Sequence, residues 1–272
     1  MTLKQDLQVI RYSLGRHKLH KKQKDYISWY YEERPRLFQF QNIHEGEDCF
    51  IIGNGPSLNK MDLTLLNDYY TFGLNKIFLI FKRVDLKLRY YVSVNRLVIE
   101  QSVNDIKKLT CPAFLSYPNA GSDRPTQNNL FYLFTKGGTD GFQKSITESI
   151  YEGGTVTYVA MQLAFFMGFR NVYLIGVDHN FVQQGTANSE QLMQGPDLNH
   201  FDSNYFSGLK WNLADLESSE LGYTYAKVNY DFHGRRIYNA TVGGNLKIFE
   251  RVTFDEALTK AKKASDSPRK MV

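Results

Sequence analysis

The chain has 272 residues, of which 42% are hydrophobic and 14% aromatic, and its formal net charge is +5. This composition excludes a disordered chain, and the length allows one large domain with appendages. Two cysteines are too few for a disulfide framework or a cysteine metal site. No run approaches the roughly 20 apolar residues of a membrane span. We expect a cytoplasmic protein whose mild charge favours no nucleic-acid partner.

Both ends of the chain are basic. Residues 1–46 are predicted to form a basic helical extension, in which Leu3, Leu7, Ile10 and Leu14 recur among lysines and arginines. This pattern is typical of a helix that covers a sheet, and also of a helix that contacts an anionic membrane surface or a partner. The first interpretation is the more common one. Residues 251–272 are predicted to form a basic C-terminal tail.

The first strand leads into a glycine-rich turn. An apolar run over residues 49–52 is typical of a strand buried on both faces. The turn after it consists of Gly53, Asn54, Gly55, Pro56 and Ser57. Its glycines allow close backbone approaches, and the helix start after it offers N–H groups to a phosphate or carboxylate. An ordinary tight turn is the alternative.

This turn is not one of the two commonest phosphate-binding loops. It lacks the Gly-Lys-Ser/Thr ending of a P-loop, and Leu58 stands where the dinucleotide fingerprint needs a small residue. Binding of ATP by a P-loop and binding of NAD by a Rossmann fingerprint are therefore disfavoured.

Three predicted strands are followed by asparagine. The strands over 49–52, 69–74 and 88–94 lead to Asn54, Asn75 and Asn95. Because the carboxyl ends of parallel strands line the ligand crevice of an open sheet, these amides are expected to face one pocket. Asparagine also favours strand-ending turns for local reasons.

The second half of the chain repeats this arrangement of strand, turn and helix. Gly153, Gly154 and Thr155 open a helix that ends at Gly168, and a strand over 172–177 ends at Asp178. Residues 178–212 form a long polar and aromatic loop typical of a lid. A helix over 213–230 and a strand over 235–241 follow. The alternation predicts an α/β fold with a Rossmann-like open, mainly parallel sheet and helices on both faces, over residues 47–250.

Taken together, these motifs resemble a known superfamily. The sequences Ile-Gly-Asn-Gly-Pro-Ser-Leu at 52–58, Gly-Gly-Thr at 153–155 and Gly-Phe-Arg-Asn-Val-Tyr-Leu-Ile-Gly-Val-Asp at 168–178 carry the resemblance. The superfamily joins bacterial family 42 sialyltransferases, motile-accessory-factor flagellin glycosyltransferases and 6-hydroxymethyl-dihydropterin pyrophosphokinase-like proteins. The resemblance covers residues 47–250. It implies nucleotide binding by Gly53, Asn54, Gly55, Pro56, Ser57, Asn75, Asn95, Gly153, Gly154, Thr155 and Asp178.

The sialyltransferase branch implies an inverting transfer of a nonulosonate-type sugar. The donor would be a CMP-linked sugar and the acceptor a glycan hydroxyl of a surface polysaccharide or glycoconjugate, without a metal cofactor. Histidine, with an unperturbed pKa of about 6.5, suits the base, and His200 is the first candidate and His179 the second. Tyr205 would help the phosphate leave, in place of the tyrosine that this branch has near position 180. Arg235 and Arg236 are candidate phosphate or carboxylate partners, or surface strand residues.

Two other functions remain open on the sequence. An ATP-dependent pyrophosphokinase would need Mg²⁺, for which Asp178, Asp197 and Asp202 are candidate ligands. The chain contains no Asp-x-Asp motif, which most metal-dependent nucleotide-sugar transferases use. A non-catalytic nucleotide-binding scaffold is the third function, and a homo-oligomer is compatible with each.

Overall fold

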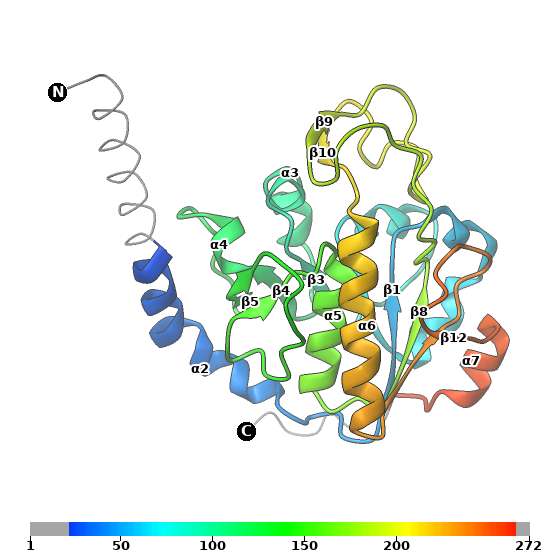
Figure 1. Cartoon of the computed structure of the whole chain (residues 1–272), viewed down its shortest axis with the longest axis horizontal. Helices are drawn as coiled ribbons and strands as arrows, with labels where there is room; N and C mark the ends of the chain where they lie inside the picture. Colours follow the sequence, from blue (N-terminus) through cyan, green and yellow to red (C-terminus); the bar gives the residue numbers. More distant parts are fainter. Residues whose placement is uncertain (1–21, 265–272) are drawn as a thin grey trace.

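The computed structural model describes residues 22–264, and the predictions made for residues 1–21 and 265–272 lie outside the described part. Eight parallel strands form one sheet (Figure 1). They are β1 (Asp48–Ile52), β2 (Tyr70–Leu74), β3 (Tyr90–Ser93), β4 (Ala113–Ser116), β5 (Leu130–Leu133), β8 (Asn171–Ile175), β11 (Arg236–Asn239) and β12 (Glu250–Arg251). The predicted open parallel α/β sheet is confirmed.

The order of the strands places a switch point beside β1. The sheet runs β12-β11-β8-β1-β2-β3-β4-β5, so the chain first builds outward from β1 to β5 and then returns to the other side of β1. In such open sheets the ligand crevice lies at the carboxyl ends of the strands where the order reverses. The strand register joins Ile52 of β1 to Ile175 of β8. The turns after β1 and β8 therefore meet at this point.

Helices and short helical turns cover both faces of the sheet. Residues 22–32 are helical. The further α-helices are α2 (Arg34–Leu37), α3 (Arg96–Ile106), α4 (Tyr117–Ala120), α5 (Val156–Phe166), α6 (Leu216–Phe232) and α7 (Phe254–Lys260). The 3₁₀ turns are η1 (Phe38–Phe40), η2 (Pro56–Lys60), η3 (Leu63–Asp68) and η4 (Ile77–Lys82). In Figure 1, α5 and α6 lie side by side in front of the sheet. A small parallel pair, β6 (Thr135–Lys136) with β7 (Ile150–Tyr151), precedes α5.

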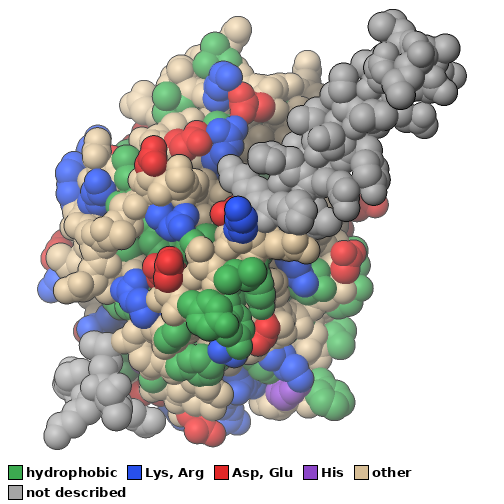
Figure 2. Space-filling model, turned by 90° about the vertical axis from the view of Figure 1, so that its left-hand side faces the viewer, with side chains coloured by type: hydrophobic (Ala, Val, Ile, Leu, Met, Phe, Trp, Pro, Cys, Tyr) green, Lys and Arg blue, Asp and Glu red, His purple; other side chains and the backbone are tan. Residues whose placement is uncertain are grey.

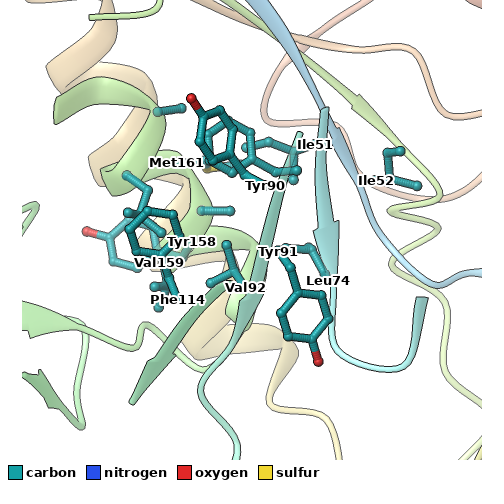
Figure 3. Close-up of a cluster of buried hydrophobic side chains, with 14 of the residues drawn as sticks. Ile51, Ile52, Leu74, Tyr90, Tyr91, Val92, Phe114, Tyr158, Val159 and Met161 are labelled. Atoms are coloured by element: carbon teal, nitrogen blue, oxygen red, sulfur yellow. The ribbon is translucent and has the colours of Figure 1, made fainter. Parts of the chain in front are cut away.

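The core between α5 and the sheet is aromatic. Figure 3 shows Tyr158 and Val159 of α5 beside Tyr90 and Phe114 of the strands, whereas Tyr91 points the other way. This is the alternation expected of a strand covered on both faces. All five residues are buried, so α5 is fixed on the sheet.

Three segments depart from the predicted organisation. Trp29 and Leu37 of the predicted extension are fully buried and belong to the main core. The boundary at residue 250 falls inside β12, and the predicted tail contains α7, which Thr253 and Glu256 cap reciprocally. The predicted lid contains an antiparallel pair, β9 (Glu190–Leu192) with β10 (Lys210–Asn212). Short apolar runs and local capping are weak signals in a sequence, which explains why the sequence analysis did not predict these three features.

The surface near the helix over residues 22–32 carries exposed apolar side chains. Figure 2 shows hydrophobic groups gathered among charged ones on the face that carries α2. Ile27, Tyr30, Tyr31 and Phe38 are the exposed large hydrophobic residues of this segment. Contact of this region with a membrane stays a prediction. Within residues 22–264, no helix is long and apolar enough to cross a bilayer.

Replacing Gly53 with alanine is expected to destabilise the fold, because the new Cβ would lie 2.3 Å from the Gly176 carbonyl oxygen. Overpacking of this kind costs about 1–3 kcal/mol, and each kcal/mol lowers the melting temperature by roughly 2–4 °C. Gly137→Ala is the matched control, since nothing lies within 4 Å of its Cβ position and its φ is not positive. Equal melting temperatures of the two variants by circular dichroism would contradict the close approach.

Candidate functional site

A cavity lies at the carboxyl edge of the sheet, at the switch point between β1 and β8. Its volume is about 140 Å³. Nine of the predicted site residues line it, namely Gly53, Asn54, Gly55, Asn75, Gly154, Thr155, Asp178, His179 and His200. The structure thus brings together the turn after β1, the end of β2, the start of α5, the turn after β8 and the lid.

Backbone contacts hold the two central turns against each other. The amide of Gly53 donates to the Ile175 carbonyl at 2.8 Å, and the amide of Gly55 donates to the Gly176 carbonyl at 2.8 Å. A Cβ on Gly55 would lie 1.9 Å from an Asp178 carboxylate oxygen. Gly53 and Gly55 are therefore needed because a side chain at either position would collide with the turn after β8.

The Asp178 carboxylate is hydrogen-bonded to Ser57 of the neighbouring turn. It accepts from the Ser57 amide at 3.1 Å and from the Ser57 hydroxyl at 2.6 Å. Burial raises the pKa of Asp178, while these bonds oppose the rise. The N–H groups at the start of η2 were predicted to receive an anion, but Asp178 already occupies the amide of Ser57. Neither Pro56 nor Ser57 lines the cavity.

Asn54 carries an unsatisfied acceptor. Its Oδ1 atom is buried and has no hydrogen-bond partner among the described residues, although the residue lines the cavity. A buried acceptor without a partner costs about 1–3 kcal/mol. A ligand that places an N–H or O–H donor in the cavity would remove this cost. The other predicted asparagine of the cavity, Asn75, accepts from the Ser93 hydroxyl at 3.1 Å.

His200 forms a pair with a buried carboxylate. Its Nδ1 lies 2.8 Å from Asp197 Oδ2, and the Asp197 side chain is fully buried. The second ring nitrogen, Nε2, has no hydrogen-bond partner in the described chain, and His200 lines the cavity. A carboxylate at Nδ1 fixes the tautomer that leaves Nε2 free to accept a proton. This is the arrangement of a general base with its orienting acid.

Tyr205 lies behind His200 and does not line the cavity. Its ring is stacked on the imidazole with centroids 4.0 Å apart and an interplanar angle of 4°. Its hydroxyl accepts from the Lys76 amide at 3.0 Å, and burial raises its pKa well above the usual range. The expected contact of this hydroxyl with a leaving phosphate is therefore not present. Tyr205 instead supports the His200 ring.

Two other predicted residues have structural contacts. Asn95 caps α3 by accepting from the Val98 amide at 3.2 Å, and its amide group donates to Asn212 of the lid at 3.0 Å. His179 lines the cavity, but its Nε2 lies 3.0 Å from a Glu220 carboxylate oxygen. Because this nitrogen already has a partner, His179 is a weaker base candidate than His200.

The remaining predicted residues lie away from the cavity lining. Gly153 packs against the ring of Tyr158, where a Cβ would lie 2.2 Å from a ring carbon. Arg235 donates to the Phe165 carbonyl at 2.6 Å, and Arg236 pairs with Asp231. Both arginines lie at the start of β11. In a parallel sheet the strand starts lie at the amino edge, opposite to the carboxyl edge that carries the cavity. The structure does not bring them to the site at the carboxyl edge.

The sequence analysis missed residues that come from helices and from the lid. Tyr223 of α6 and Asn199 of the lid are buried and line the cavity. Asn199 bonds the Val182 backbone in both directions, at 2.7 and 3.2 Å. No spacing in the sequence indicates that a mid-helix tyrosine reaches the strand ends, since only the packing of α6 on α5 brings it there.

The carboxylates do not form a metal site. Within residues 22–264, no three His, Cys, Asp or Glu side chains gather in a way that could hold an ion. Asp178 is bonded to Ser57, Asp197 to Asn199 and His200, and Asp202 to the Asn204 amide. Within residues 22–264, the three carboxylates predicted as Mg²⁺ ligands therefore do not gather into one cluster.

The fold and the cavity define a doubly wound α/β protein with a pocket at its switch point. Residues 27–184 match the family model for 6-hydroxymethylpterin diphosphokinase MptE-like proteins. The chain belongs to this family, which confirms the superfamily that its motifs indicate.

No curated protein matches the chain. A solved structure of the sialyltransferase CstII from Campylobacter jejuni, in complex with the substrate analogue cytidine-5'-monophosphate, is similar in part, at 16% identity and a TM-score of 0.47. The match covers 77% of this chain and 86% of that chain.

Proposed function

We propose that the protein is a sialyltransferase-like glycosyltransferase, which transfers a nonulosonate-type sugar from a CMP-linked donor to a glycan hydroxyl. The observation that carries the proposal is the pair of His200 and Asp197 at the cavity that Asn54 also lines. A base of this kind is needed to take a proton from a hydroxyl, and such catalysis contributes about 10²–10⁴-fold.

The proposed reaction is a single displacement. The acceptor oxygen attacks the anomeric carbon, and the bond from this carbon to the phosphate oxygen breaks. CMP leaves with the bonding electrons, and His200 Nε2 takes the proton of the acceptor hydroxyl. Attack opposite the leaving group inverts the anomeric centre. Asp197 stabilises the imidazolium that forms, because its carboxylate faces Nδ1.

The unsatisfied Asn54 Oδ1 supports a nucleotide ligand. The exocyclic amine of a cytosine base and the ribose hydroxyls are donors that such an acceptor can bind. The motif resemblance to sialyltransferases favours cytidine among the nucleotides. The reaction as proposed uses only side chains of this chain and no metal ion.

The second candidate is a 6-hydroxymethylpterin diphosphokinase, which the family match favours. That reaction transfers a diphosphoryl group from ATP and needs Mg²⁺ to neutralise the phosphates. We place it second because the carboxylates of the site are already bonded to protein donors.

A ligand panel in a thermal melt tests the two candidates. A ligand at a hundred times its dissociation constant adds about 2.7 kcal/mol, which raises the melting temperature by roughly 5–10 °C. We expect this rise with CMP in the presence of EDTA. A rise with an ATP analogue only when Mg²⁺ is added would transfer the proposal to the diphosphokinase, and no rise with any nucleotide would contradict both.

A further inference from the structure

Lys76 is a buried lysine that the proposed reaction does not use. Its exposed fraction is 5%, and it directly follows Asn75 at the end of β2. The ammonium Nζ donates to Gln101 Oε1 of α3 at 2.9 Å and to the Tyr205 carbonyl of the lid at 3.0 Å. The backbone amide of Lys76 also donates to the Tyr205 hydroxyl at 3.0 Å. One residue thus holds both ends of Tyr205.

The residues that Lys76 holds support the His200 ring. The Nζ atom lies 4.6 Å from the centroid of the Phe206 ring, within the range of a cation–π contact. Tyr205 stacks on His200, and Phe206 meets the same imidazole edge-on with centroids 5.3 Å apart. Trp211 packs on Phe206 with centroids 5.9 Å apart. The imidazole is therefore enclosed by rings whose place depends on Lys76.

The environment of Lys76 is unusual for a lysine. Burial lowers the pKa of its ammonium to about 8, and the nearby Asp197 carboxylate opposes this fall. Tyr205, the other ionisable neighbour on the lid, has a raised pKa, and α3 contributes the uncharged Gln101. A lysine kept at such a cost in desolvation is typical of a functional site.

We expect the lid to move when a large ligand enters. The cavity of about 140 Å³ is smaller than the roughly 300–1,000 Å³ of ligand pockets. Besides the Lys76 contacts, the Phe201 amide donates to the Asn54 carbonyl at 2.9 Å. Lys76 connects β2 and α3 to the lid. Its hydrogen bonds therefore favour one closed position of the lid.

We infer that Lys76 is a positioning residue that latches the lid onto β2 and α3 and thereby sets the place of the His200 imidazole. It acts through Tyr205 and Phe206, and it does not touch the substrate. The catalytic consequence rests on the proposed function, whereas the latch itself can be measured without any substrate.

Trp211 provides the substrate-free readout, because the chain has two tryptophans and the other, Trp29, is fully buried and donates to the Tyr132 carbonyl of β5. The Lys76→Met variant is expected to increase the quenching of Trp211 fluorescence by acrylamide, with the Trp211→Phe protein used to subtract the Trp29 signal. The matched control is Lys82→Met, since Lys82 is an exposed lysine of η4. Quenching of the Lys76 variant that equals the control value would overturn the latch.

Turnover gives the second readout. The kcat of Lys76→Ala is expected to fall by roughly 10- to 100-fold with the affinity for CMP unchanged, because a displacement of about 1 Å in a catalytic group costs as much as 10²-fold. Ethylamine or propylamine added to this variant is expected to restore part of the kcat. A general loss of stability would not respond to an added amine, so absence of rescue together with unchanged quenching would refute the inference.

Gln101→Leu removes the α3 acceptor of Lys76 Nζ, and also the bond that Gln101 Nε2 donates to the Lys210 carbonyl of the lid at 2.7 Å. It provides a test if the Lys76 variants do not fold. Its Trp211 quenching is expected to lie between the values of the native protein and the Lys76 variants. Native quenching in Gln101→Leu would count against the latch. If no CMP-linked sugar is turned over by the native protein, the proposed function fails, and the quenching experiments still decide the latch.

Discussion

His200→Ala is expected to lower the kcat of sugar transfer by about 10²–10⁴-fold, because the variant loses the base that accepts the proton of the attacking hydroxyl. Nucleotide affinity should stay within twofold of the native value, since His200 is assigned to the acceptor side of the reaction. Asp197→Asn should give a smaller loss in kcat. It keeps the hydrogen bond to Nδ1 in altered form but removes the charge that stabilises the imidazolium.

Two other histidines are suitable comparisons. His233 is exposed at the end of α6 and bonds the Asn229 carbonyl, so His233→Ala should leave kcat unchanged. His179→Gln is the critical variant, because this residue also lines the cavity but is paired with Glu220. If it lost more turnover than His200→Ala in the same steady-state assay, the base would be wrongly assigned.

Asn54→Ala is expected to separate ligand affinity from the stability of the free protein. Loss of a hydrogen bond to the nucleotide should weaken CMP binding by roughly 10- to 100-fold, at 1.4 kcal/mol per factor of ten. The free protein should be no less stable than the native protein, because the substitution removes a buried acceptor that has no partner in the described chain. Isothermal titration calorimetry and thermal melts measure the two effects separately.

Asn67→Ala is the opposite control for this experiment. Asn67 donates to the Asp85 carbonyl at 2.8 Å and accepts from the Lys87 amide at 2.8 Å, and none of the three residues lines the cavity. Its removal should lower the melting temperature and leave the CMP affinity as it was. If Asn54→Ala behaved like Asn67→Ala in both measurements, Asn54 would be a structural residue and not a ligand contact.

The strand ends were predicted well because the central strands are mainly apolar. The five residues of β1 are all buried, and the apolar run over residues 49–52 is typical of a central strand. Parallel strands place their following turns at one edge of the sheet, which is why Asn54, Asn75 and Asn95 were expected at one pocket. Asn54 and Asn75 line the cavity together with Asp178, whereas Asn95 is outside the lining and caps α3.

The side-chain environment could not be predicted in the same way. A lysine is usually exposed, so nothing in the sequence indicates that Lys76 is buried. Only the fold of the lid over β2 buries it. Tyr205 was expected to reach the ligand, but the stack on His200 turns it away. Arg235 and Arg236 could have been placed better, because residues that begin a parallel strand stand at the edge opposite to the crevice.

The most direct test of the proposed function is the release of CMP from a CMP-linked nonulosonate by the purified protein in the presence of EDTA, followed by NMR with a glycan acceptor. We expect CMP to appear together with a glycoside of inverted anomeric configuration, and His200→Ala to lose both signals. Absence of CMP release, together with diphosphoryl transfer from ATP to 6-hydroxymethylpterin that requires Mg²⁺, would contradict the proposed glycosyltransferase.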